Sequence, residues 1–384
     1  MATAQTALAF DDLPLPQRRL PAQRPLVRGH SATRLAMLPA ARVAEAPALL
    51  PEDDAAAPDP AFALGWDYAH HGLVPPAEHL LPAHPLRQGW EAGRAAFGGR
   101  TLRAGDRVQR WLDLRLAAWT RGQPFETTEV TANYLAQIDS PRCPVTRAPL
   151  GDAAGEQAGR VERLNPRAGY AAGNLATVSP RVQQAMAGKR WDEARLAAVL
   201  AQARAADGSG AGTVEGLGGA EWARLATLMS FATPLPHELA ATLPLRVLPP
   251  NRVRLLNPIQ GLQALITLQL THSGFAARIA QVVGLLPGLD LRRDFHLFFH
   301  SLLPRAWQGG RPESAEVMRG RLEDAWGDAG VLRRWQRFAS QLGAEQADQL
   351  VHKLVAKGLA SGIPGAQRVQ WHTPARATEG WALA

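Results

Sequence analysis

The sequence predicts a mainly α-helical protein with a small central ββα unit embedded in helices, an all-helical C-terminal domain and a disordered N-terminal arm. Three observations predict this class. Apolar residues recur at intervals of three and four through most of the chain beyond residue 104, which is the spacing of amphipathic helices. Two short runs that read as strands, Arg160 to Leu164 and Leu175 to Val178, lie on either side of a Pro/Gly-rich loop and interrupt that pattern. Residues 1–60 carry repeated Pro and Ala without a sustained period.

The elements before the central unit follow in order. Residues 61–100 set aromatic side chains among glycines and prolines, and we expect an ordered segment of irregular shape there. Apolar residues from Val108 to Trp119 share one helical face, which predicts a helix over 104–121. Thr127-Thr128-Glu129 is a start signal for a second helix that contains Tyr134 and Ile138 on one face.

The central unit is predicted from a strand, a loop, a second strand and a helix. Arg160 to Leu164 form the first strand, and Leu175 to Val178 the second. Ser179-Pro180 then starts a helix, because Ser is favoured at the cap and Pro at the first helical position. A further helix from Trp191 to about Ala205 precedes a Gly-rich stretch.

That Gly-rich stretch is the clearest predicted domain boundary, since its composition is that of a flexible linker. Beyond it, stretches of apolar residues at helical spacing, separated by Pro or Gly, predict an all-helical domain. This domain is a candidate surface for binding a protein partner. The expected organisation is a disordered arm (1–60), a helical segment with the ββα unit (61–205, core 140–190), a linker (206–218), the all-helical domain (219–362) and a tail (363–384).

Composition excludes several classes of protein. The lone Cys143 excludes a disulfide framework and a thiolate-rich zinc site, so no structural zinc is expected. No apolar stretch reaches the roughly 20 residues that span a bilayer, and residues 1–10 lack the basic start of a secretory signal. We therefore expect a cytoplasmic protein without a membrane partner. The sequence pI of about 10.6 is weak evidence for an anionic partner, because 39 of the 42 basic residues are arginines, as a GC-rich coding sequence produces in any protein.

One stretch carries a motif. Arg160-Val-Glu-Arg-Leu-Asn-Pro166 is followed by Gly169-Tyr170, by Gly173-Asn174 and by the helix with Gln183 and Lys189. This order resembles the HNH endonuclease family, in the branch where an Asp-Arg-Ile-Asp strand is followed by Gly-Tyr, by Gly-Asn and by a helix bearing Asn and Lys. The resemblance covers about residues 126–190, roughly a sixth of the chain.

The resemblance implies a ββα fold that holds one divalent metal ion and hydrolyses a nucleic-acid phosphodiester bond. Glu162 stands where the family has its metal-binding Asp, and Arg163 where most members have the general-base His. Asn174 matches the Asn that ties down the loop between the strands and orients the base, and Gln183 matches the last ligand. The implied catalytic residues are Glu162, Arg163 and Asn174, and the implied ligands of Mg²⁺ or Mn²⁺ are Glu162 and Gln183.

The sequence departs from the family at two of these positions. A guanidinium cannot accept a proton at neutral pH, so Arg163 is expected to clamp a phosphate instead of acting as a base. No histidine lies between His84 and His237, so a base would come from another part of the chain or from metal-bound water. Gln183 is a neutral amide and a poorer ligand for a hard cation than a carboxylate.

Three interpretations therefore remain: a metal-dependent nuclease, an HNH-like fold that binds nucleic acid or protein without catalysis, and a surface ion pair among turn-forming glycines. Local charge favours a nucleic-acid partner, and DNA is the one expected. Residues 142–190 hold eight Lys/Arg against three acids, a net charge of +5, whereas residues 1–100 come to −1. The expected nucleic-acid-binding residues are Arg160, Arg167, Arg181, Lys189 and Arg190.

A histidine group near the N-terminus is a second candidate site. His70, His71, His79 and His84, with Asp67, are residue types that bind zinc, but their spacing matches no ligand rule. One of them could instead supply the missing base. The prolines around them favour a surface or capping role.

Overall fold

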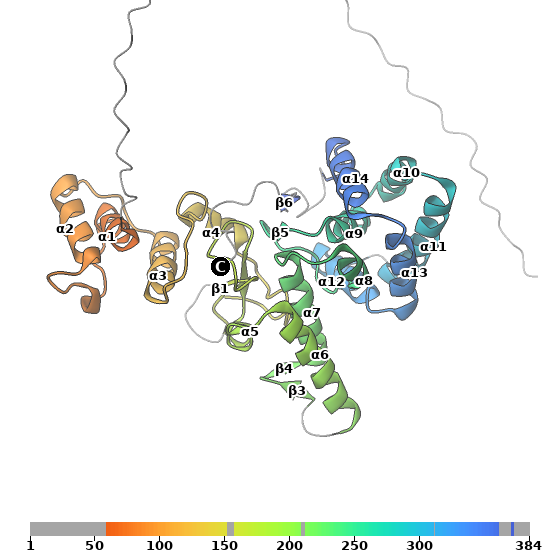
Figure 1. The fold of residues 1–384 in the computed structure, drawn as a ribbon, viewed down its shortest axis with the longest axis horizontal. Coiled ribbons are helices and arrows are strands. Elements are labelled where there is room, and N and C mark those ends of the chain that lie inside the picture. Colours follow the sequence, from red (N-terminus) through yellow and green to blue (C-terminus); the bar gives the residue numbers. More distant parts are fainter. Residues whose placement is uncertain (1–58, 152–156, 209–211, 311, 361–369, 372–384) are drawn as a thin grey trace, which may run out of the picture. The chain divides into compact units, whose positions relative to one another are not determined.

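The computed structural model of the chain describes residues 59–151, 157–208, 212–310, 312–360 and 370–371. The mainly helical class is confirmed, with only short two-stranded sheets among the described residues (Figure 1). The expected disordered arm falls on residues 1–58 almost entirely, and most of the expected tail on 361–369 and 372–384, so both lie outside the described residues.

The elements follow the chain in this order. The helices are α1 (Pro60–His70), the 3₁₀ turn η1 (Ala77–His79), α2 (Pro85–Phe97), α3 (Asp106–Thr120), α4 (Ala132–Ile138), α5 (Pro180–Met186), α6 (Trp191–Ala206), α7 (Gly219–Phe231), α8 (His237–Thr242), α9 (Pro258–Gln269), α10 (Phe275–Leu285), α11 (Leu289–Ala306), α12 (Ala315–Ala325), α13 (Ala329–Ala339) and α14 (Ala344–Ala356). The strands are β1 (Arg160–Arg163), β2 (Leu175–Val178), β3 (Thr213–Val214), β4 (Leu217–Gly218), β5 (Arg254–Leu255) and β6 (Gln370–Trp371).

Residues 61–100 contain two helices, α1 and α2, where an irregular segment was expected, and the stretch between them is turns and loop with one 3₁₀ turn. The α1 and α2 helices cross so closely that a Cβ atom added at Gly65 would lie 1.9 Å from the carbonyl oxygen of Leu86, and one at Gly89 would lie 2.0 Å from that of Phe62. The glycines that suggest turns in the sequence therefore serve a helix crossing, where the absence of a side chain lets two backbones touch.

The expected ββα unit is present. β1 pairs with β2 in antiparallel register, with Glu162 opposite Ala176 and Arg163 opposite Leu175. Pro180 stands at the start of α5 as expected, but the hydroxyl of Ser179 makes no capping hydrogen bond and is buried without a partner. All four residues of β2 are buried, and its one polar side chain, Thr177, donates to the carbonyl of Ile138 at 3.1 Å.

The predicted linker 206–218 connects two helices that pack against each other. Its described residues include the small hairpin of β3 and β4, in which Val214 pairs with Leu217. Trp222 of α7 donates its indole N–H to the carbonyl of Val214 at 2.8 Å, which fixes the hairpin to the helix. The described residues from 59 onward belong to one compact unit, and the described part of this segment lies within it.

The C-terminal helices surround α9, whose residues from Ile259 to Gln269 are all buried. Aromatic side chains of α11 and α13, with Trp326 just after α12, meet beside it, and the ring centroids of Phe298 and Trp335 lie 5.2 Å apart. No helix within the described part of the chain has the length and apolar character needed to cross a membrane.

Candidate functional site

A cleft of about 490 Å³, here called the β1–α5 cleft, lies where the motif predicted a site. Its walls come from β1, from α5, from the loop between the two strands, and from the turn after α3. The polar and charged residues that line it are Arg121, Gln123, Glu162, Arg163, Tyr170, Gln183, Gln184 and Lys189.

Glu162 and Gln183 meet in this cleft, as the motif predicts. Nε2 of Gln183 donates to Oε2 of Glu162 at 3.1 Å, and the backbone N–H of Arg163 donates to Oε1 at 3.1 Å. Both carboxylate oxygens of Glu162 therefore already accept a hydrogen bond from the protein itself.

Arg163 is held in place by the loop between the strands. Its Nη1 donates to the carbonyls of Pro166 and Ala168, each at 3.1 Å, and its guanidinium carbon lies 5.2 Å from the ring centroid of Tyr170. Its Nε is buried without a hydrogen-bond partner. Burial raises the pKa of Tyr170, and the negative charge of Glu162 raises it further. The hydroxyl of Tyr170 therefore stays neutral beside the guanidinium of Arg163. The cleft thus presents a pre-oriented cation.

Asn174 lies inside the loop and does not line the cleft. It is fully buried, its Oδ1 accepts from the backbone N–H of Asn165 at 2.8 Å, and its Nδ2 donates to the carbonyls of Asn165 and Gly169 at 3.0 and 2.9 Å. These bonds close the loop that carries Pro166 and Ala168, so Asn174 fixes the partners of Arg163.

Arg121 and Gln123 belong to the cleft although no motif marks them. Nη2 of Arg121 donates to the hydroxyl of Tyr170 at 3.1 Å, and Oε1 of Gln123 is buried without a partner. Both follow α3, about 40 residues before β1, so only the tertiary fold brings them to the motif. Two buried polar atoms without partners, Oε1 of Gln123 and Nε of Arg163, therefore border one cleft.

The donors in this cleft fit a divalent cation poorly. Mg²⁺ and Mn²⁺ prefer several carboxylate, carbonyl and water oxygens, whereas the cleft offers one carboxylate whose two oxygens are engaged. Across the described residues, no three His, Cys, Asp or Glu side chains gather in a way that could hold a metal ion. The other charged groups lining the cleft are the cations Arg121, Arg163 and Lys189, which repel a metal ion.

The basic cluster of residues 142–190 is mostly neutralised by acids from elsewhere in the chain. Five of its eight cations form ion pairs: Arg142 with Glu316, Arg147 with Glu323 and Asp324, Arg181 with Glu221, Lys189 with Glu215, and Arg190 with Asp192. Within the residues that the structure describes, no ion pair involves Arg160, Arg163 or Arg167. A local charge count therefore overstates the positive surface.

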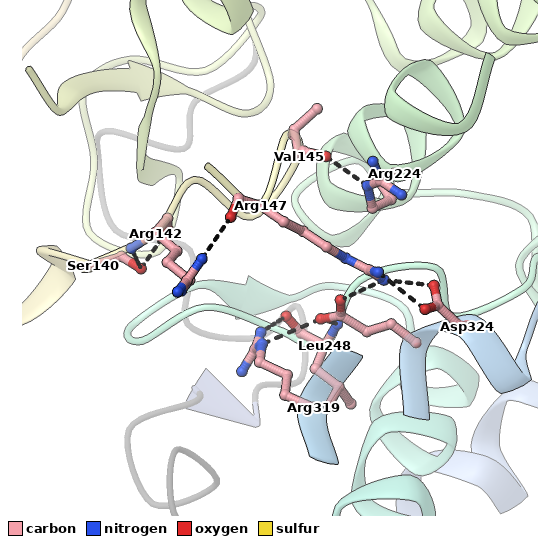
Figure 2. A network of polar contacts seen from close by, with 9 residues as sticks. Ser140, Arg142, Val145, Arg147, Arg224, Leu248, Arg319 and Asp324 are labelled. Carbon is pink, nitrogen blue, oxygen red and sulfur yellow. Dashed lines mark hydrogen bonds and ion pairs between the residues drawn. The ribbon is translucent and has the colours of Figure 1, made fainter. Parts of the chain in front are cut away.

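Figure 2 shows where part of this charge goes. Arg147 reaches into the helical domain, where its Nη2 lies 3.1 Å from Oε2 of Glu323 and 2.8 Å from Oδ1 of Asp324. Arg319 and the backbone N–H of Leu248 reach the other oxygen of Glu323 at 3.2 and 2.9 Å. Burial raises the pKa of Glu323, and the two guanidiniums oppose that rise. Arg147 is therefore a structural connection between the ββα unit and α12.

Replacing Arg147 with Ala is expected to lower the free energy of unfolding by about 2 kcal/mol, because it leaves the buried Glu323 with Arg319 as its one cation. Arg142→Ala is the matched control. Its pair with Glu316 has both side chains more than half exposed, so the expected loss is below about 1 kcal/mol. Urea unfolding of both variants measures the difference, and equal losses would contradict the assigned role of Arg147.

The N-terminal histidines take structural positions. Nδ1 of His84 accepts the backbone N–H of Leu86 at 3.2 Å and so caps α2, and the rings of His79 and His84 both lie edge-on to Trp119. Asp67 forms an ion pair with Arg115. None of the four histidines is among the residues that line the β1–α5 cleft.

Comparisons of the chain with protein-family models, with curated proteins and with solved structures found no match. The resemblance to HNH endonucleases therefore depends on the residues quoted above. The structure adds the geometry of those residues: Glu162, Arg163 and Gln183 share one cleft, while Asn174 holds the loop behind it.

Proposed function

We propose that this chain binds nucleic acid, with DNA as the expected ligand, by holding a backbone phosphate in the β1–α5 cleft without hydrolysing it. The observation that carries the proposal is the lining of that cleft: the cations Arg121 and Arg163, a lysine that is paired with Glu215, and one carboxylate already bonded to Gln183. Such a site attracts an anion and offers it hydrogen bonds.

The geometry of Arg163 favours this function. Hydrogen bonds to two carbonyls and contact with Tyr170 fix the guanidinium before any ligand arrives, so little side-chain entropy is lost on binding. Arg121 donates to the hydroxyl of the same tyrosine, so two planar cations contact Tyr170. The residues that line the cleft include no histidine, the side chain that most often acts as a general base near neutral pH.

Salt-dependent binding tests the proposal. Arg163→Gln is expected to weaken the binding of DNA about tenfold and to lower the slope of log K against log salt by about 1, as the loss of one phosphate contact does. Arg103→Gln removes the same charge from an exposed site that does not line the cleft and should leave both quantities nearly unchanged. Equal effects of the two variants would reject the cleft as the binding site.

Hydrolysis is the second candidate, because Glu162 and Gln183, the two residues at the family's ligand positions, meet at 3.1 Å. A plasmid-nicking assay with Mg²⁺ or Mn²⁺ separates the two functions. We expect supercoiled plasmid to be retained by the protein and to stay intact. Metal-dependent nicking that disappears in Glu162→Ala would instead establish the nuclease.

A further inference from the structure

A second groove of about 320 Å³ lies next to the β1–α5 cleft. Pro166 lines both, and the turn between α5 and α6 contributes Lys189 to the first and Arg190 to the second. The second groove also contains Arg167 and Trp191, and it is here called the Trp191 groove. The β1–α5 cleft and the Trp191 groove are therefore neighbours that share Pro166.

Trp191 gives this groove an aromatic side chain, which also lines a neighbouring hollow together with Arg195. The ring is partly buried against the main core, which anchors it, and it begins α6. The guanidinium carbon of Arg195 lies 6.0 Å from the ring centroid. Proline side chains at Pro234 and Pro236 line the groove as well, so much of its wall is apolar and rigid.

The Trp191 groove carries cations that can pair with the phosphates of a nucleic-acid backbone. Arg167 is exposed and pairs with no described carboxylate, and its backbone N–H is tied to Oδ1 of Asn165 at 3.0 Å. Arg190 pairs with Asp192, which also lines the groove, at 2.7 Å, and its Nε lies 3.8 Å from Glu193. These side chains are about half exposed, so a phosphate can compete for Arg190 at little cost.

We infer that the ligand of the β1–α5 cleft is single-stranded DNA, with the phosphate in that cleft and a neighbouring base against Trp191; this rests on the proposed function. A base stacks on an aromatic side chain only when its face is free, and in a duplex both faces are covered by neighbouring base pairs. The arrangement of cations in one hollow and an aromatic side chain in the next is that of a single-strand site.

Fluorescence anisotropy of the full chain with a labelled thymidine oligonucleotide, alone and annealed to its complement, tests this inference. The single strand is expected to bind at least about tenfold more tightly than the duplex. Trp191→Leu should lose about tenfold in affinity for the single strand, whereas Trp191→Phe, which keeps a stacking ring, should retain most of it. Trp66→Leu, a change to a partly buried tryptophan on α1, is the control and should bind like the wild type.

Equal affinity for single strand and duplex, or wild-type affinity in Trp191→Leu, would overturn the inference. If Trp191→Leu melts early, Arg167→Gln tests the same groove from an exposed position and should weaken single-strand binding severalfold, with wild-type affinity counting against the groove. Failure of the proposed function gives a different result: neither form of the oligonucleotide would bind in a salt-dependent way, and Arg163→Gln would change nothing.

Discussion

Gly89→Ala is expected to separate α1 from α2 and to lower the free energy of unfolding of the N-terminal helices by at least about 3 kcal/mol. The new Cβ atom would lie 2.0 Å from the carbonyl oxygen of Phe62 and 2.7 Å from its carbonyl carbon. Both are backbone atoms, so no side chain can rotate away, and the helices themselves must move apart. Gly65→Ala makes the same test from the other helix, since its Cβ would lie 1.9 Å from the carbonyl oxygen of Leu86.

The sign of this result separates packing from helix propensity. Alanine is favoured over glycine inside a helix by about 1 kcal/mol, so propensity alone predicts that both variants gain stability. Gly284→Ala is the matched control, because Gly284 lies within α10 and a Cβ added there would meet nothing within 4 Å. Urea unfolding should show a large loss for Gly89→Ala and a small gain for Gly284→Ala. Similar gains for both would show that α1 and α2 do not cross as closely as described.

The helices and strands that could be predicted from the sequence are those that depend on the spacing of nearby residues. Apolar spacing predicts the helices of the C-terminal part, and two short runs around a Pro/Gly loop, followed by Ser179-Pro180, predict β1, β2 and α5. The resemblance implies that Glu162, Asn174 and Gln183 converge on one point; Glu162 and Gln183 do lie together, at 3.1 Å, whereas Asn174 is buried inside the loop. In each case neighbours in sequence, or a short loop between them, determine the outcome.

Features that depend on distant partners could not be predicted in this way. The glycines of α1 and α2 suggest turns until the second helix is known to touch them. The net charge of +5 counted over residues 142–190 omits Glu316, Glu323 and Asp324, which lie more than 120 residues beyond it. Arg121 and Gln123 reach the β1–α5 cleft through tertiary folding alone, so no spacing rule identifies them.

Asn174→Ala is expected to have the largest combined effect on stability and on DNA binding. The substitution leaves the N–H of Asn165 and the carbonyls of Asn165 and Gly169 buried without the partner that Asn174 supplies. Each unsatisfied group costs about 1–3 kcal/mol, so we expect a loss of about 3 kcal/mol or more in the free energy of unfolding. Asn133→Ala, on the exposed face of α4, is the control and should change it by less than about 0.5 kcal/mol.

Asn174 should also control binding, although it does not line the cleft. It closes the loop whose Pro166 and Ala168 carbonyls orient the guanidinium of Arg163, so a loosened loop releases that cation. DNA affinity measured well below the melting temperature should therefore fall in Asn174→Ala about as far as in Arg163→Gln, and the double variant should lose little more than either single one. Additive losses in the double variant would mean that Asn174 acts on DNA by a route other than Arg163.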